Sequence, residues 1–421
     1  MVKLGKIGAN MDSFSILLGK GIQKISKLRG GGGSALPGLF VEKTNPNFLR
    51  KTLSKLPYGV VVISGTNGKT TTTKIVSELL AKQGLKVFTN KTGSNFVRGA
   101  ISAILEEIKV SGKFDYDIAV LELDEAHAVK FCENVPVNYS LILNVQRDQL
   151  DRFGEIDHTA ELLEKLTTST KKCVVLNRED SRVAKLKGQK VIYYGLSTPL
   201  LKNFPNDDNL LDAKSEKKSN KKASVTLDKL KGQIATYDIE GQKFSCDLTL
   251  KGIYNAYNAA GALALCHEIM PEIPVGEFIK YLDCIESAFG RGEVFKINGA
   301  DVELLLVKNP AAFQLSLASF ADNNHEYMIA INDETADGHD VSWLWNVDFK
   351  ALPRVKYVSG TRAADMALRL KYDEIPVDGG NPDITIATNR FMSESKNPKR
   401  IFATYTAMLE IRKIITGKSL L

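Results

Sequence analysis

One glycine-rich stretch of the sequence has the residue types and the spacing that bind a phosphate group. It reads Gly65-Thr66-Asn67-Gly68-Lys69-Thr70. Glycines let backbone N–H groups converge on phosphate oxygens, and a helix that begins here adds the favourable end of its dipole. Lys69 would neutralise charge on the transferred phosphate, and the Thr70 hydroxyl would bind Mg²⁺. The sequence therefore predicts a phosphate loop, and the alternative is a glycine-rich turn with no function.

The surroundings of this stretch favour the phosphate loop. Its spacing is shorter than the usual G-x-x-x-x-G-K-T, because Ile63 stands five residues before Gly68 and the first glycine is Gly65. The β-branched run Val60–Ile63 directly precedes the loop, and apolar residues at helical spacing follow it. A strand before and a helix after the loop are the context that phosphate binding needs.

Acidic residues follow two later apolar runs and could complete a metal site. Glu122 lies near the end of the run Ile118–Leu123, and Asp148 and Asp151 come just after Leu141–Val145. In a parallel sheet, the carboxyl ends of the strands share one edge, so these groups would face the phosphate loop. Carboxylates suit Mg²⁺, and we predict a site that includes Thr70 and Glu122. The alternative is that these acids lie in solvated loops.

Apolar runs alternate with stretches of helical spacing along much of the chain. The predicted strands are Val60–Ile63, Lys86–Phe88, Ile118–Leu123, Leu141–Val145, Val174–Leu176, Val302–Val307, Tyr327–Ile331 and Val355–Val358. A strongly helical stretch runs from Asn255 to Met270. The alternation indicates an α/β protein with parallel sheets. We expect a basic N-terminal segment (1–40), a central phosphate-loop domain (41–294) and a C-terminal α/β domain (295–421).

Two basic stretches do not belong to this alternation. From Leu4 to Ile25, apolar residues recur every three or four positions with lysines between them. This pattern predicts a helix that packs on the protein, and the alternative is a helix on a membrane surface. An insertion at about 200–245 is rich in lysine at positions Lys214, Lys217, Lys218, Lys221 and Lys222. It predicts a solvated loop, with an anion-binding patch as the alternative.

Composition excludes several classes of protein. The chain has 421 residues, of which 43% are hydrophobic and 25% charged, as in soluble globular proteins. A net charge of +7 is small for a dedicated nucleic-acid binder. No apolar run approaches the ~18 residues of a transmembrane helix. The scattered cysteines contain no CxxC pair, which suits a reducing cytoplasm and argues against a cysteine metal site. We expect a cytoplasmic protein that does not bind nucleic acid.

The phosphate loop and three further segments resemble the Mur ligase family of ATP-dependent ligases. The segments are Gly65 to Thr72, Glu122, Asn255-Ala256-Tyr257-Asn258-Ala259-Ala260 and Gly290-Arg291. The resemblance implies that ATP and Mg²⁺ bind, that Asn258 reads adenine and that Arg291 contacts the nucleotide phosphates. The alternatives are an ordinary polar helix position for Asn258 and a surface ion pair for Arg291. The loop residues implied to touch the nucleotide are Gly65, Thr66, Asn67, Gly68, Lys69, Thr70 and Thr71.

Within that family, the chain is similar to the MurT-type synthetase subunits of lipid II isoglutaminyl synthase. The likeness rests on residues 147–155, 308–311 and 336–343. It implies amidation of the D-glutamate α-carboxylate in the lipid II stem peptide, through an acyl phosphate, with ammonia from a GatD-type glutaminase partner. It also implies that Asp340 completes the partner's Cys–His pair as a catalytic residue, since a carboxylate can hold a histidine in the right tautomer. The alternative for Asp340 is a turn-forming aspartate.

The sequence departs from the family pattern in two places. Many MurT-type proteins carry a four-cysteine zinc ribbon, but the stretch 200–245 contains no cysteine, so we expect no zinc. Many amino-acid-adding Mur ligases have a histidine where this chain has Gln149, and a carbamylated lysine for which Lys165 is a loose candidate. These departures leave the second metal site without predicted ligands.

Two other functions would use the same phosphate loop. One is a ligase that adds an amino acid, of the muramyl-peptide or folylpolyglutamate type. The other is a nucleotide-binding scaffold whose ATP site regulates assembly. The segment from Asp337 to Asp340 favours the amidating subunit. Its lipid-linked acceptor would bring the chain to the inner surface of the membrane.

Overall fold

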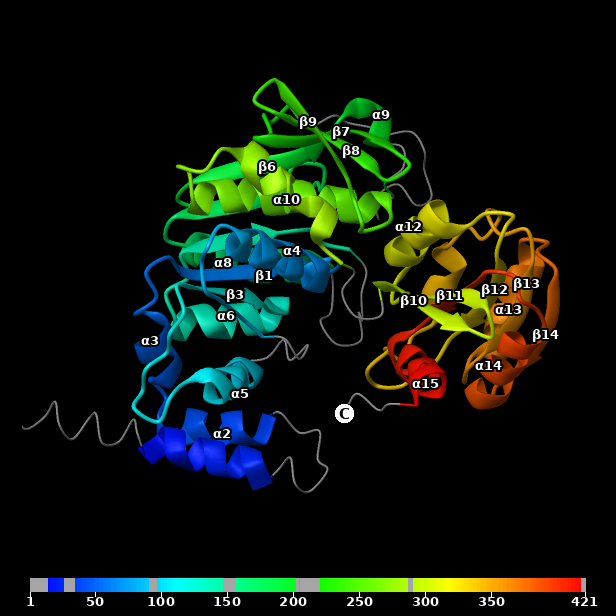
Figure 1. The fold of residues 1–421 in the computed structure, drawn as a ribbon, viewed down its shortest axis with the longest axis horizontal. Helices are drawn as coiled ribbons and strands as arrows, with labels where there is room; N and C mark the ends of the chain where they lie inside the picture. Colours follow the sequence, from blue (N-terminus) through cyan, green and yellow to red (C-terminus); the bar gives the residue numbers. More distant parts are fainter. Residues whose placement is uncertain are drawn as a thin grey trace, which may run out of the picture.

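The computed structural model describes two bodies that lie side by side, each built on its own sheet (Figure 1). The residues that it describes are 14–25, 35–90, 97–146, 156–201, 204, 220–286 and 291–417. The predicted α/β class is confirmed. Within these ranges, no helix combines the length and the apolar character that crossing a bilayer requires.

The first sheet has nine strands in the order β2-β3-β1-β4-β5-β6-β7-β8-β9. Its parallel strands are β1 (Gly59–Ser64), β2 (Val87–Thr89), β3 (Ile118–Glu122), β4 (Tyr139–Ile142), β5 (Cys173–Asn177), β6 (Val191–Leu196) and β7 (Val225–Lys231). Every residue of β1, β3, β4 and β5 is buried, which is why these strands read as unbroken apolar runs. Because β1 pairs with both β3 and β4, the carboxyl ends of these strands share one edge.

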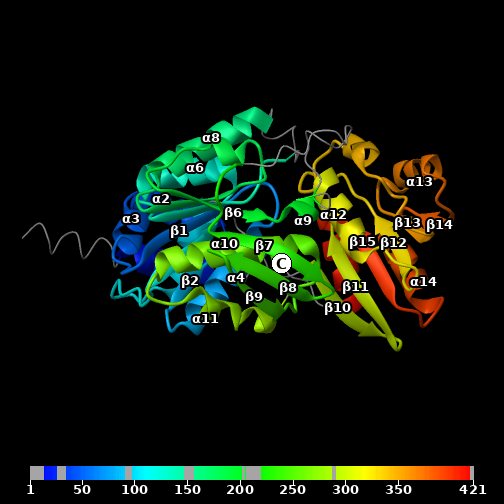
Figure 2. The ribbon, with the colours of Figure 1, turned by 90° about the horizontal axis from the view of Figure 1, so that it is seen from above.

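Helices cover both faces of this sheet, so that three layers are visible from above (Figure 2). Val61 and Ile63 of β1 face α4 (Lys69–Lys82), α10 (Ile253–Ile269) and α11 (Val275–Ile279). Val60 and Val62 face the layer that contains α3 (Phe48–Leu53), α6 (Glu125–Asn134) and α8 (Ile156–Ser169). A helix over residues 14–25 packs at the end of that layer with α2 (Ala35–Thr44) and α5 (Val97–Glu107). A short helix, α9 (Thr198–Leu201), follows β6.

The prediction of a solvated loop over 200–245 is wrong for its second half. The chain there forms β7, β8 (Ile234–Ile239) and β9 (Gln242–Asp247), an antiparallel extension of the first sheet. Alternate residues of β8 are buried, among them Ala235 and Tyr237. This period of two is a strand signal that the neighbouring lysines obscured. Lys214, Lys217 and Lys218 lie outside the described residues, whereas Lys221 donates a hydrogen bond to the Tyr193 hydroxyl at 2.7 Å.

The second sheet has six strands in the order β10-β11-β15-β12-β13-β14. Its strands are β10 (Arg291–Ile297), β11 (Ala300–Leu306), β12 (Glu326–Ala330), β13 (Val355–Ser359), β14 (Val377–Asn381) and β15 (Lys399–Ala403). All neighbours are parallel except β10 and β11. One face packs on α12 (Pro310–Phe320) and α13 (Ala363–Tyr372), and the other on α14 (Ile384–Ser393) and α15 (Tyr405–Thr416). The three C-terminal strands predicted from apolar runs are confirmed as β11, β12 and β13.

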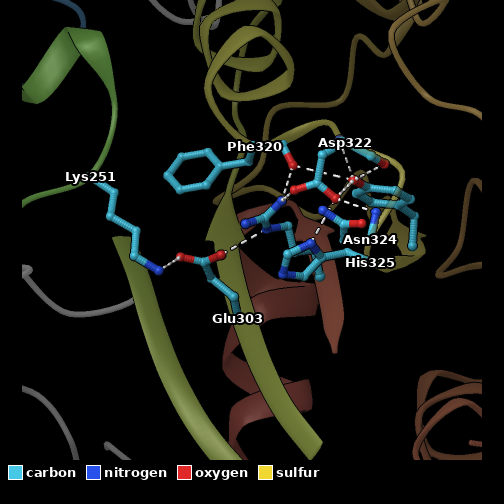
Figure 3. Close-up of polar contacts among 8 residues, drawn as sticks. Lys251, Glu303, Phe320, Asp322, Asn324 and His325 are labelled. Carbon is cyan, nitrogen blue, oxygen red and sulfur yellow. Dashed lines mark hydrogen bonds and ion pairs between the residues drawn. The ribbon is translucent and has the colours of Figure 1, made fainter. Parts of the chain in front are cut away.

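A cluster of charged residues lies where the two bodies meet (Figure 3). Glu303 of β11 and Arg400 of β15 are buried, and Arg400 Nε donates to Glu303 Oε2 at 2.8 Å. Lys251, which precedes α10, reaches Glu303 Oε1 at 3.3 Å. On its other side, Arg400 donates to Asp322 Oδ2 at 2.6 Å, and His325 Nδ1 lies 2.8 Å from Asp322 Oδ1. The cluster joins the strands of the second sheet and extends one ion pair to the first body.

The charge of Asp322 depends on this cluster. Burial opposes ionisation of the carboxyl, but hydrogen bonds from His325, from the Asn324 backbone N–H and from Arg400 hold its pKa well below the usual 3.8. A carboxyl whose pKa is lowered by folding stabilises the folded state above its unfolded pKa. The contribution of Asp322 is therefore present at neutral pH and is lost as the pH falls below about 4.

We expect Glu303→Gln to lower the free energy of unfolding by about 3 kcal/mol, because it removes the buried one of the two carboxylates that pair with the Arg400 guanidinium. Urea denaturation followed by tryptophan fluorescence measures this change. Asp301→Asn on the same strand is the control, since the Asp301–Lys296 pair spans 4.0 Å at the exposed surface. The control should change stability by less than about 0.5 kcal/mol. Equal losses in the two variants would contradict the role given to the buried pair.

Candidate functional site

The glycine-rich loop crosses from β1 to α4 in a conformation that glycine favours. Gly65 has φ +126° and Gly68, the residue before α4, has φ +89°. A Cβ on Gly65 would lie 2.9 Å from the backbone N of Asn144, and one on Gly68 would lie 2.8 Å from the Asn258 side chain. Both positions therefore exclude other residues through backbone strain and close contact. The loop therefore passes directly beside the Asn258 side chain.

Lys69, Thr70 and Glu122 lie together at the carboxyl edge of the first sheet. Lys69 is 7% exposed, and its Nζ donates to Gly65 O at 2.7 Å and pairs with Asp124 Oδ1 at 3.1 Å. Thr70 Oγ1 donates to Glu122 Oε1 at 3.0 Å. Glu122 is held in turn by Asn90, whose side chain bonds to both backbone polar groups of Glu122. The two predicted metal ligands, Thr70 and Glu122, are thus in direct contact.

Hydrogen bonds connect the loop to residues of both bodies. Asn67 N donates to Asn144 Oδ1 at 2.8 Å, and Asn67 Nδ2 donates to Gln146 Oε1 at 2.6 Å. From the second body, Asn309 Nδ2 donates to Asn67 Oδ1 at 3.0 Å, and Lys308 Nζ donates to Thr66 O at 2.9 Å. The loop is therefore in contact with residues 242 positions further along the chain.

The sequence did not predict these contacts, although one local signal was present. Asn309 followed by Pro310 is a helix-start pattern, and Asn309 indeed caps α12 by accepting a hydrogen bond from Ala312 N. That pattern predicts the start of the helix but not that it lies against the phosphate loop. Asn144, Gln146 and Asn90 carry no comparable signal, because isolated amides are common in loops.

A cavity opens beside the loop and is lined by both bodies. Its lining includes Asn67, Gly68, Asn177, Asp180, Phe204, Tyr254, Asn255, Tyr257, Asn258, Leu305, Leu306 and Ser316. Phe204 and Tyr257 meet edge to face with ring centroids 5.1 Å apart. Apolar and aromatic walls with a few amides suit a flat heterocycle such as a nucleotide base. Asn258 is among the residues that line this cavity, and that it reads adenine stays a prediction.

Buried polar groups at this site support binding of a polar ligand. The Thr71 hydroxyl and Asn255 Oδ1 are buried and have no hydrogen-bond partner among the described residues. Such groups cost free energy unless a ligand or water satisfies them. Burial also raises the pKa of Asp180 in the cavity wall, although backbone N–H groups of Val183, Val145 and Arg182 oppose the shift. These features fit a site that is completed by a bound molecule.

Several predicted residues cannot be placed at the site. Asp148, Asp151 and Gln149 lie outside the described residues, and so does the side chain of Arg291, whose backbone begins β10. Lys165 is exposed on α8, and its carbamylation stays a prediction. In the described ranges, no group of three or more His, Cys, Asp or Glu side chains could hold a metal ion. The metal site therefore rests on Thr70 and Glu122.

Asp340 lies on the second body and does not line the cavity. It is exposed, and its Oδ1 accepts a hydrogen bond from Ser342 N at 2.8 Å. Hydrogen bonds from Ser342 lower the pKa of Asp340, so the carboxylate is ionised at neutral pH. This hydrogen bond forms the turn that the alternative interpretation of Asp340 expects, and the negative charge of Asp340 faces solvent. The neighbouring Asp337 is buried instead and accepts hydrogen bonds from Thr406.

Two protein families and several known proteins are similar to this chain in sequence. Residues 63–266 match the family described as the Mur ligase middle domain, and residues 306–408 match the family described as the MurT ligase C-terminal domain. The MurT subunit of lipid II isoglutaminyl synthase (glutamine-hydrolyzing) from Staphylococcus aureus (strain COL) is 30% identical over 396 residues, covering 86% of this chain and 88% of that protein. The corresponding subunit from Streptococcus pneumoniae (strain ATCC BAA-255 / R6) is 28% identical over 432 residues, covering 93% and 94%.

Solved structures show the same architecture. A pseudomurein peptide ligase type C from Methanothermus fervidus superposes with a TM-score of 0.66 at 19% identity, covering 86% of this chain and 79% of that chain. At this identity, the likeness concerns the fold alone. It confirms that the two-sheet arrangement is that of a Mur-ligase-type protein.

We expect Gly68→Ala to reduce the affinity for ATP with Mg²⁺ at least tenfold, because the added methyl group displaces the Asn258 amide and strains the loop. Gly84→Ala is a matched control, since Gly84 follows the same helix with φ +93° and has no atom within 4 Å of its would-be Cβ. Both variants should lose about 1 kcal/mol of stability. Calorimetric titration should show loss of affinity in the Gly68 variant alone, and equal affinities would contradict the placement of the nucleotide.

Proposed function

The chain belongs to the MurT family of Mur ligases and is an ATP-dependent ligase; from this premise we propose that it amidates the D-glutamate α-carboxylate in the stem peptide of lipid II. One observation carries the proposal. Lys308 and Asn309, at the start of the MurT-type C-terminal domain, bond directly to the loop residues Thr66 and Asn67 of the Mur-ligase-type domain. The domain that is particular to the MurT family thus contacts the glycine-rich loop of the Mur-ligase-type domain.

In this proposal, ATP binds with its base in the cavity beside Asn258 and its phosphates on the loop from Gly65 to Thr71. The fit is supported by the left-handed Gly65 and Gly68 and by the unpartnered Thr71 hydroxyl. Lys69 would exchange its contact with Asp124 for a phosphate oxygen, and Arg291 would add a second positive charge. Thr70 and Glu122 would hold Mg²⁺, which draws charge from the transferred phosphoryl group.

The reaction has two steps, the first at the terminal phosphorus of ATP and the second at the acyl carbon of the acceptor. A carboxylate oxygen of the acceptor attacks the terminal phosphorus of ATP, ADP leaves, and an acyl phosphate forms. Ammonia then attacks the acyl carbon, the bond from that carbon to the phosphate oxygen breaks, and phosphate leaves as the nitrogen loses a proton. The positive charge of Lys69 lowers the first barrier by compensating charge on the transferred group.

Ammonia would come from a glutaminase subunit that docks near Asp340. The ionised, exposed carboxylate of Asp340 could accept a hydrogen bond from a histidine of the partner. Five residues further along, Trp345 is 49% exposed and packs edge to face on Tyr372, which is 70% exposed. Exposed aromatic pairs are typical anchors of protein interfaces. The lipid-linked acceptor would place this complex at the cytoplasmic surface of the membrane.

The competing function is a ligase that adds an amino acid and needs no partner. It shares the loop and the acyl phosphate, so the phosphate site does not separate the two functions. The match to the MurT C-terminal domain over residues 306–408 favours amidation. Amino-acid addition by the chain alone would support the competitor.

We expect Lys69→Ala to lower both ADP formation and amidation at least about a hundredfold in an assay with the glutaminase partner, glutamine, ATP and lipid II. Lys74→Ala is the control, because Lys74 lies on the same helix and pairs with Glu78 at the surface. The control should retain its rate within about twofold. Absence of glutamine-dependent amidation in the unmodified protein would refute the function. A Lys69 variant that loses ATP binding but keeps cellular function would indicate a scaffold.

We expect Asp340→Asn to abolish amidation that depends on glutamine while amidation with added ammonium chloride continues, because only the partner's histidine would need the carboxylate. Asp348→Asn is the matched control. Asp348 is also exposed and accepts a hydrogen bond from the backbone N–H two residues later, here Lys350, as Asp340 does from Ser342. If both variants behaved alike, or if ammonia-dependent amidation were lost as well, Asp340 would be a structural residue only.

A further inference from the structure

The helix over residues 14–25 exposes an apolar face. Phe14, Leu17 and Ile25 are 65%, 58% and 54% exposed, and Leu18 is 37% exposed. At 100° per residue, these side chains and Gly21 fall within about 100° of arc on one side of the helix. Gly21 is exposed too, with no atom near its would-be Cβ. On an ordinary surface helix, the side that faces water carries polar side chains.

The opposite side of the same helix is fixed to the protein. Ile16 is 1% exposed and belongs to the apolar core beneath it. A Cβ on Gly19 would lie 2.8 Å from Val41 of α2 and 2.9 Å from Leu105 of α5, so the helix backbone packs closely there. Gln23 Nε2 donates to Ser102 O at 3.2 Å. The helix therefore packs on this body through its opposite side, and the exposed face is not part of the core.

The flank of the exposed face is basic. Lys24 is exposed beside it, and Lys20 lies one turn earlier, with its Nζ near Glu106 O at 3.3 Å. The sequence contains no acidic residue between Asp12 and Glu42, whereas it contains Lys20, Lys24, Lys27 and Arg29. A second copy of the chain would bring Lys20 and Lys24 close to the same residues of its partner, which disfavours self-association through this face. Anionic lipid headgroups are complementary to them.

We propose that the outward face of the helix at 14–25 binds an anionic membrane surface, with Phe14, Leu17, Leu18 and Ile25 inserted among the headgroups and acyl chains and Lys20 and Lys24 at the headgroup level. A helix of this length lies in the plane of the interface and does not span it. The inference rests on the proposed function, because a lipid-linked acceptor requires an enzyme at the membrane. It identifies the element of the fold that makes the contact.

Co-sedimentation of the full chain with large vesicles of phosphatidylglycerol and phosphatidylethanolamine tests the proposal. We expect binding that weakens in high salt and is at least tenfold weaker for pure phosphatidylcholine vesicles. The double variant Leu17→Asp/Ile25→Asp should bind the anionic vesicles at least tenfold less. Leu368→Asp/Ile386→Asp is the matched control, since these residues are 48% and 52% exposed on the second body. The control should bind like the unmodified protein.

Three outcomes would overturn the inference. They are failure of the unmodified protein to bind anionic vesicles, equal binding by the two double variants, and a dimer in light scattering that only Leu17→Asp/Ile25→Asp dissociates. Amidation of lipid II in detergent micelles separates this inference from the proposed function. The Leu17/Ile25 variant should amidate the micellar substrate at the unmodified rate and lose rate only on vesicles. Absence of micellar amidation in the unmodified protein would refute the function without bearing on vesicle binding.

Discussion

The site depends on how the charge of the buried Lys69 ammonium group is compensated. A charge that is 7% exposed must be compensated, and Gly65 O, Asp124 and, at 3.9 Å, Glu125 do this in the structure. With Glu122 nearby on the same strand end, the local balance is negative. A nucleotide triphosphate would add further negative charge, so it would enter this site favourably only with a divalent cation. In the proposed function, Mg²⁺ would therefore offset the negative charge around Lys69 as well as that of the phosphates.

The parallel sheet is what brings these groups to one place. β1 leads into the phosphate loop, β3 ends at Glu122 and β4 leads to Asn144 and Gln146, and both β3 and β4 pair with β1. Because the strands run in the same direction, three segments that are far apart in the sequence deliver their polar residues to a common edge. α10 then places Asn258 against Gly68 from the helical layer. The fold therefore determines the site through strand direction, and the loops supply the chemistry.

Burial explains which features could be predicted from the sequence. β1, β3 and the interior of α10 have nearly every residue buried, so their apolar runs indicate both the element and its position. The glycine-rich loop stands out in the sequence because its pattern is local: the glycines, Lys69 and Thr70 lie within six residues, and their role in binding phosphate stays a proposal. β8 buries only alternate residues and β9 buries none, so neither forms an unbroken apolar run, and the polar neighbours masked the alternation. The pairing of Asn67 with Asn309 could not be predicted, since it depends on how two bodies pack, and the local signals at the two positions indicate only a loop and the start of a helix.

The polar contacts that join the two bodies are weaker than the ionic pair inside the second body, and this difference has a consequence for catalysis. Within the second body, Glu303 and Arg400 form a buried ionic pair that resists rearrangement. Lys251 is 49% exposed, so its bond to Glu303 is screened by water and weak. The contacts of Asn309 and Lys308 with the loop are single hydrogen bonds, worth about 1 kcal/mol each net, or somewhat more for the charged lysine. A bound nucleotide offers the loop stronger, charged contacts than these. The loop can therefore exchange its bonds to Lys308 and Asn309 for bonds to a nucleotide, and this exchange leaves the Glu303–Arg400 pair of the second body in place.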